Sequence, residues 1–111
     1  MDLGLTVDAR DGWTVLSVSG ELDMATAPSV RERLHALLAA GDDRLIIDLD
    51  EVSFLDSTAL GVLVGILKRV RTQDGDLRLV CAQPRVLKVF EITRLDQAFT
   101  IRDSVDAAVD G

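Results

Sequence analysis

The sequence predicts an α/β domain built on a mixed sheet of four to five strands with about four helices. Three observations support this prediction. The chain has 111 residues, which suits one domain covering residues 1–111. Strand-like apolar segments alternate with segments of helical periodicity, which favours parallel strand pairs. No linker, repeat or low-complexity stretch interrupts the chain.

The N-terminal segment is expected to form a β-hairpin. Apolar residues alternate with polar or small ones over residues 3–7, as in a half-buried edge strand. The pair Asp11-Gly12 is a typical hairpin turn signal. Alternation resumes over residues 13–19, which predicts a second strand that ends at Gly20.

A helix is expected after the loop formed by residues 21–25. Thr26 is a candidate N-cap, and Pro28 falls in the first turn, where proline is tolerated. Gly41 is expected to end the helix. The apolar positions have the spacing of an amphipathic helix and are Val30, Leu34, Leu37 and Leu38.

The rest of the chain continues the alternation of strands and helices. A short run rich in β-branched residues predicts a central strand, and proline opens one of the later helices. In order, we expect a strand at 44–49, a helix from about Thr58 to about Gln73, a strand at 77–82, a helix from Pro84, a short strand at 99–101 and a last helix capped by Asp103 or Ser104.

Composition and charge exclude several classes of function. Twelve basic against 19 acidic residues give a net charge of −7 without a basic stripe, so nucleic acid is not an expected partner. No apolar run is long enough to span a bilayer, and no cationic then apolar segment opens the chain, so we expect a cytoplasmic protein without membrane insertion. One histidine and one cysteine suffice neither for a metal site nor for a nucleophilic triad, so no cofactor, metal or enzymatic activity is expected.

The segment Asp56-Ser57-Thr58 marks the expected change from strand to helix. Ser57 lies where the helix begins, so its hydroxyl oxygen can cap the helix. It can also carry a phosphate, which the positive end of the helix dipole would accommodate. Asp56 has three open roles: it positions the serine hydroxyl, contacts the enzyme that would add a phosphate, or hydrogen-bonds the loop backbone.

The helix that follows has an unusual outer face. At about 100° per residue, the side expected to face the sheet carries Leu60, Leu63, Val64 and Leu67. The opposite side has no charge for two turns and carries Thr58, Gly61, Val62, Gly65 and Arg69. A solvated face normally carries several charges. Either another element of the domain covers this face, or it is a protein-contact surface that begins at Ser57.

Two blocks of sequence resemble a known family. The segment 54–63, which reads FLDSTALGVL, and the segment 20–23, which reads GELD, resemble the motifs of STAS domains, in particular of bacterial anti-sigma factor antagonists. Their spacing is also similar, and the resemblance covers nearly the whole chain. One departure is Ala59, where many members have glycine; alanine suits a helix interior better.

The resemblance implies a regulatory role. In this family, the serine that matches Ser57 is phosphorylated by a cognate anti-sigma factor, which is itself a kinase, and a serine phosphatase reverses the reaction. The unphosphorylated protein binds the anti-sigma factor and releases a sigma factor. The chain has no glycine-rich phosphate-binding motif, so the kinase would supply ATP.

The implied site consists of Ser57 and a set of partner-binding residues. Thr58 is a less favoured phosphate acceptor than Ser57, and the small-residue face could instead mediate a homodimer. The partner-binding set is Asp23, Thr26, Asp56, Ser57, Thr58, Gly61, Val62 and Gly65.

Two alternative functions remain at this stage. The first is a STAS subunit of a lipid-transport or signalling scaffold complex without a phosphorylation cycle. The second is a receiver-like phosphoryl carrier, with Asp48 or Asp56 as the acceptor. A receiver also needs an acidic pair near the first strand and a late lysine, and Asp8 and Asp11 do not form such a pair.

Overall fold

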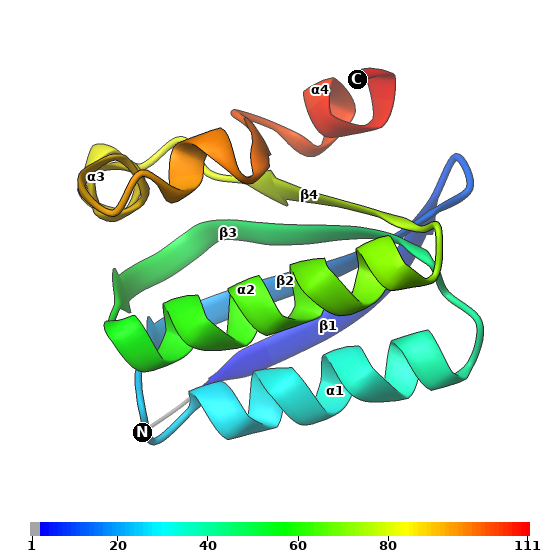
Figure 1. The fold of residues 1–111 in the computed structure, drawn as a ribbon. Helices are drawn as coiled ribbons and strands as arrows, with labels where there is room; N and C mark the ends of the chain where they lie inside the picture. Colours follow the sequence, from blue (N-terminus) through cyan, green and yellow to red (C-terminus); the bar gives the residue numbers. More distant parts are fainter. Residues whose placement is uncertain (1–2) are drawn as a thin grey trace.

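The computed structural model describes residues 3–111 and contains a five-stranded sheet in the order β1-β2-β3-β4-β5 (Figure 1). β1 and β2 are antiparallel, and the remaining pairs are parallel. This confirms the predicted α/β fold with a mixed sheet. The elements are β1 (Gly4–Arg10), β2 (Trp13–Leu22), α1 (Ala27–Ala39), β3 (Arg44–Leu55), α2 (Ser57–Thr72), β4 (Asp76–Val80), α3 (Pro84–Ile92), the 3₁₀ helix η1 (Leu95–Gln97), β5 (Thr100–Arg102) and α4 (Val105–Asp110).

The hairpin of β1 and β2 turns where the sequence predicts it. Asp11 and Gly12 both have positive φ angles, of 51° and 85°, as a two-residue type I′ turn requires. The predicted end of the second strand at Gly20 is wrong, because β2 continues to Leu22. Gly20 has a φ of 107°, and the pairing with β3 shifts register on either side of it, so this glycine accommodates an irregularity instead of ending the strand.

The central strand is also longer than predicted. β3 runs to Leu55 instead of residue 49. The second half of β3 lacks a regular alternation of apolar and polar residues, so the sequence does not indicate a strand there. Between residues 50 and 55 only Val52 and Leu55 are buried. The extra length keeps β3 paired with β2 as far as Leu22 and Leu55, so the two strands end together.

Helices α1 and α2 cover one face of the sheet (Figure 1). The main buried cluster of the domain is largely aliphatic and also contains Phe90 and Phe99. On α2, Leu60, Leu63 and Leu67 are buried as predicted. Val64, in contrast, is half-buried, and Ile66 is buried in addition. The buried arc of α2 is therefore turned toward α1.

The opposite face has a smaller apolar cluster under α4. Its buried residues are Trp13, Val15, Ile46, Val80 and Ala108. The guanidinium carbons of Arg44 and Arg78 lie 4.5 and 4.4 Å from the centre of the Trp13 ring, which is the geometry of cation–π contacts. Among residues 3–111, no helix is both long and apolar enough to cross a membrane.

Candidate functional site

The candidate site lies where β2 and β3 end and α1 and α2 begin. The two strands are parallel neighbours, so their carboxyl ends lie at the same edge of the sheet. The backbone N–H of Asp56 donates to the carbonyl of Leu22 over 3.2 Å, which links the end of β3 to the end of β2. Both predicted motifs, Gly20–Asp23 and Asp56–Thr58, are thereby brought together at one edge.

The loop before α1 is held by its own side chains. The Asp23 carboxylate accepts hydrogen bonds from the backbone N–H groups of Ala25 and Thr26, at 2.9 and 3.1 Å. The Thr26 hydroxyl donates to the carbonyl of Glu21 at 2.7 Å and accepts from the N–H of Asp23 at 2.9 Å. Thr26 is the N-cap residue, as predicted, but it is buried and its hydroxyl stabilises the preceding loop instead of capping the helix.

Asp56 caps the start of α2. Its carboxylate accepts from the N–H of Ala59 over 3.0 Å and from the N–H of Met24 over 3.0 Å. One side chain therefore caps α2 and links it to the loop before α1. Of the three roles left open by the sequence, hydrogen bonding to the backbone is the one that the structure shows.

The prediction that Ser57 caps α2 is wrong. Ser57 is the first residue of the helix, and the capping position and its extended backbone belong to Asp56, with a ψ of −178°. The difference arises because both residues can cap a helix, and the sequence does not show at which of them the helical dihedral angles begin.

The hydroxyls of Ser57 and Thr58 are free. Both residues are exposed, and neither side chain hydrogen-bonds to any other residue between 3 and 111. The first turn of α2 contains no acidic residue, and the Asp56 cap offsets part of the positive charge of the helix N-terminus. A serine oxygen at this position is accessible to an enzyme and lies where added negative charge is tolerated best.

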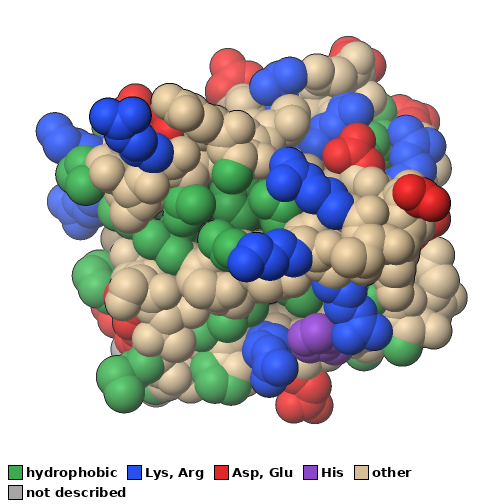
Figure 2. Space-filling model, in the orientation of Figure 1, with side chains coloured by type: hydrophobic (Ala, Val, Ile, Leu, Met, Phe, Trp, Pro, Cys, Tyr) green, Lys and Arg blue, Asp and Glu red, His purple; other side chains and the backbone are tan. Residues whose placement is uncertain are grey.

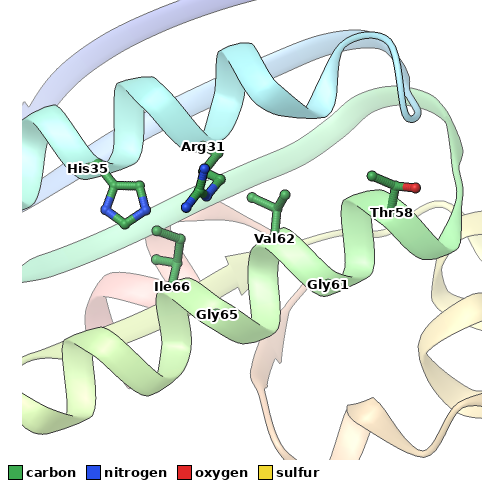
Figure 3. A pocket seen from close by; sticks show the side chains of 7 residues that line it. All are labelled: Arg31, His35, Thr58, Gly61, Val62, Gly65 and Ile66. Carbon is green, nitrogen blue, oxygen red and sulfur yellow. The ribbon is translucent and has the colours of Figure 1, made fainter.

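A groove of about 370 Å³ runs between α1 and α2, starting beside this junction (Figure 3). Thr58 lies at one end and His35 at the other, and Arg31 reaches from α1 toward α2 between them. The lining residues are Arg31, His35, Thr58, Gly61, Val62, Gly65 and Ile66. The small face of α2 is therefore partly flanked by α1, with Val62 half-buried, while Gly61 and Gly65 remain exposed.

The groove carries positive charge at its His35 end. The Arg69 guanidinium lies 3.1 Å from Nδ1 of His35, so the imidazole nitrogen accepts this hydrogen bond. Desolvation lowers the pKa of His35, and the positive charges of Arg69 and Arg31 lower it further. The histidine is thus held in its neutral form beside two permanent cations.

Two exposed apolar side chains near the site are absent from the predicted set of partner-binding residues. Met24 is 75% exposed and follows Asp23 in the first loop. Phe54 is 49% exposed and lies two residues before Asp56. Arg31 and His35 were also absent from that set. Two features of the sequence could have indicated these residues: Met24 is an apolar residue within a polar loop, and Arg31 and His35 are spaced i, i+4 on one face of α1.

The strand order excludes the sheet that a receiver-like carrier needs. Flavodoxin-like and receiver sheets have the order 2-1-3-4-5, whereas this sheet has the sequential order with an antiparallel first pair. Asp48 lies within β3 instead of at its end, and burial raises the pKa of its carboxyl. Within residues 3–111, no cluster of three or more His, Cys, Asp or Glu side chains is placed to hold a metal.

Comparison with known proteins gives one consistent family. The STAS domain family model matches residues 5–108. The anti-sigma-B factor antagonist of Bacillus subtilis (strain 168) is 36% identical over 109 residues, which cover 98% of this chain and 99% of the relative. That of Listeria monocytogenes is 38% identical over 104 residues, which cover 93% of this chain and 91% of the relative.

Solved structures show the same similarity. A crystal structure of an anti-sigma factor antagonist from Mycobacterium paratuberculosis superposes with a TM-score of 0.90 at 32% identity, covering 98% of this chain and 92% of that one. The antagonist SpoIIAA in its unphosphorylated form has a TM-score of 0.75 at 21% identity, covering 96% of each chain, and this likeness shows the shared fold.

Proposed function

This chain belongs to the STAS domain family, and from that premise we propose that it is an anti-sigma factor antagonist switched off by phosphorylation of Ser57. Unphosphorylated, it binds a cognate anti-sigma factor in the cytoplasm and thereby releases a sigma factor. The anti-sigma factor is also the kinase, and a serine phosphatase restores the binding form. The observation that carries the proposal is the free, exposed Ser57 hydroxyl at the start of α2, in a chain similar over its full length to antagonists.

The contact surface of this proposal surrounds Ser57. It includes the two junctions that meet at the sheet edge and the open part of the α2 face. Met24 and Phe54 add apolar area at its rim, since large exposed apolar side chains near polar ones are typical of protein-contact surfaces. The proposed residues are Asp23, Met24, Thr26, Phe54, Asp56, Ser57, Thr58, Gly61, Val62 and Gly65. Thr26 contributes by shaping the loop, because its side chain is buried.

The chemistry of the switch requires only an accessible oxygen from this chain. The kinase transfers the γ-phosphoryl group of ATP: a bond forms between Ser57 Oγ and phosphorus, the bond from phosphorus to the β–γ bridging oxygen breaks, and ADP leaves. The hydroxyl proton passes to a base of the kinase. Hydrolysis by the phosphatase returns the serine and inorganic phosphate. The antagonist itself performs no catalysis in this scheme.

Phosphorylation would prevent binding by local charge. A phosphoserine carries roughly −1.5 to −2 charges at neutral pH. The N-terminus of α2 offsets part of this charge in the free protein, so the fold is retained. A docked partner would have to desolvate the dianion next to the Asp56 carboxylate, which opposes association.

The proposal is tested with ATP and the anti-sigma factor kinase encoded in the same genome. We expect intact mass to increase by one phosphate, stable in acid and mapped to Ser57. The Ser57→Ala variant should gain none and should bind the kinase whether or not ATP is present. Thr58→Ala is the matched control and should still be phosphorylated.

Two outcomes would contradict the proposal. Acid-labile phosphate on an aspartate would indicate a phosphoryl carrier. Absence of phosphate, together with binding to a membrane transport complex, would indicate the scaffold alternative.

A further inference from the structure

The helical layer has the opposite charge from the rest of the chain. Together α1 and α2 contain five basic residues and one acidic residue, whereas the remainder contains seven basic and eighteen acidic ones. The two helices therefore carry +4 in a chain whose net charge is −7. α2 contains no acidic residue at all. A surface of this kind attracts an acidic partner and repels a basic one.

Two of these five cations, Arg31 and Arg69, lie at the groove between the two helices. Figure 2 shows Lys or Arg side chains on both sides of the histidine on this face. Arg31 and His35 line the groove, and Arg69 lies in hydrogen-bond contact with His35. Glu32, the one acidic residue of the two helices, does not line the groove; it lines two neighbouring hollows on α1, one of which also contains Arg31 and His35. The cations beside the groove thus lack carboxylate partners within 4 Å among residues 3–111.

The groove also admits a close approach of backbone. Gly61 and Gly65 lie on its α2 side, and a methyl group built on either one would meet no atom within 4 Å. Nothing inside the described fold therefore requires glycine at these positions. Glycine weakens a helix interior relative to alanine. Two glycines one turn apart on an open helix face leave space in which the backbone of a binding partner could approach α2 closely.

We propose that this groove binds an acidic segment of the anti-sigma factor, with carboxylates paired to Arg31 and Arg69 and backbone placed against Gly61 and Gly65. This inference rests on the proposed function and names the chemistry of the partner's docking segment. Arg31, which the sequence did not indicate as a partner contact, and Arg69, which the sequence placed on the outer face of α2, both become binding residues.

The position of Ser57 then explains how phosphate acts on this segment. Thr58 lines one end of the groove, and Ser57 precedes it. A dianion at that end would lie beside the part of the acidic segment that occupies this end of the groove, and repulsion is strongest for the carboxylates within the screening length of about 8 Å at physiological ionic strength. Repulsion between like charges dissociates the complex while the groove itself keeps its shape.

The test compares two arginines on the same helix. Arg31 lines the groove, whereas Arg33 lines a separate hollow beside Leu5, on the β1 side of α1. Both arginines are exposed, and Arg31→Glu and Arg33→Glu change the net charge by the same amount. Affinity for the anti-sigma factor kinase is measured by calorimetry between 50 and 500 mM salt (roughly a threefold range of Debye length).

We expect Arg31→Glu to weaken binding at least about tenfold at low salt and to flatten its dependence on salt. Arg33→Glu should weaken it less than about threefold. The Gly61→Ala variant is a second probe, since it should raise the thermal unfolding midpoint and yet weaken binding.

The outcomes separate this inference from the proposed function. If Arg31→Glu and Arg33→Glu bind alike while Ser57→Asp binds weakly, the groove inference is overturned and the proposed function stands. If Arg31→Glu changes self-association instead of kinase binding, the groove is a contact between copies of this chain, which also overturns the inference. If the unmodified protein does not bind the kinase, both fail.

Discussion

Helices α1 and α2 both begin where a parallel strand ends, and each start has an aspartate and a hydroxyl residue close together, yet the two hydroxyls have opposite surroundings. Thr26 is buried, and its hydroxyl both donates and accepts hydrogen bonds within the loop. Ser57 is exposed, and its hydroxyl has no partner between residues 3 and 111. At the second start, Asp56 alone provides the cap.

This difference separates a structural hydroxyl from an available one. A phosphate on Thr26 would break the hydrogen bonds that shape the Asp23 loop and would place a dianion in a buried position. A phosphate on Ser57 would displace no existing hydrogen bond. The aspartate that caps α2 is therefore what leaves the serine free for the proposed modification.

The largest effect should follow from adding charge at the free hydroxyl. We expect Ser57→Asp to weaken binding of the anti-sigma factor kinase by about 100-fold, which corresponds to roughly 2.7 kcal/mol. Its free energy of unfolding should change by less than about 0.5 kcal/mol, because the side chain is exposed and a negative charge suits the helix start. Calorimetric binding and urea denaturation measure the two quantities. If Ser57→Asp bound the kinase like the wild type, the free Ser57 hydroxyl at the start of α2 would have no regulatory role that distinguishes it from the buried Thr26 hydroxyl at the start of α1.

An intermediate effect should follow from removing the buried hydroxyl. Thr26→Val keeps the shape of the side chain but leaves the Asp23 N–H and the Glu21 carbonyl without their partner. We expect it to lower the free energy of unfolding by about 1–3 kcal/mol. Thr58→Val, the same substitution on an exposed hydroxyl, is the matched control and should change it by less than about 0.5 kcal/mol. Equal losses in urea denaturation would show that burial of Thr26 does not matter.

The elements and the two motifs could be predicted from the sequence, but which of two neighbouring residues caps α2 could not. The order of strands and helices follows from apolar periodicity, and the Asp11-Gly12 turn from its special dihedral angles. Asp56 caps α2 instead of Ser57 because the helical dihedral angles begin at Ser57. Residue propensities locate the start of a helix only to within a residue or two.

The charged groove was missed for a different reason. The outer face of α2 could be identified as unusual from the sequence, since its lack of charge is a pattern within a single helix. Arg31 and His35, however, belong to α1, and only the packing of α1 beside α2 brings them to that face. Sites formed between two elements depend on tertiary distances, which periodicity within one element does not contain.

The smallest effect tests whether Asp56 acts as a cap or as a link between the two starts. Asp56→Ala removes the acceptor for the Ala59 N–H and for the exposed Met24 N–H, and should lower the free energy of unfolding by about 1 kcal/mol. Asp56→Asn keeps an oxygen that can accept from Ala59 but places an amide donor toward Met24. Because asparagine caps helices about as well as aspartate, we expect its loss to stay below about 0.5 kcal/mol in urea denaturation. If Asp56→Asn were as destabilising as Asp56→Ala, the bond to Met24 or the negative charge would hold the junction, and the capping role would be secondary.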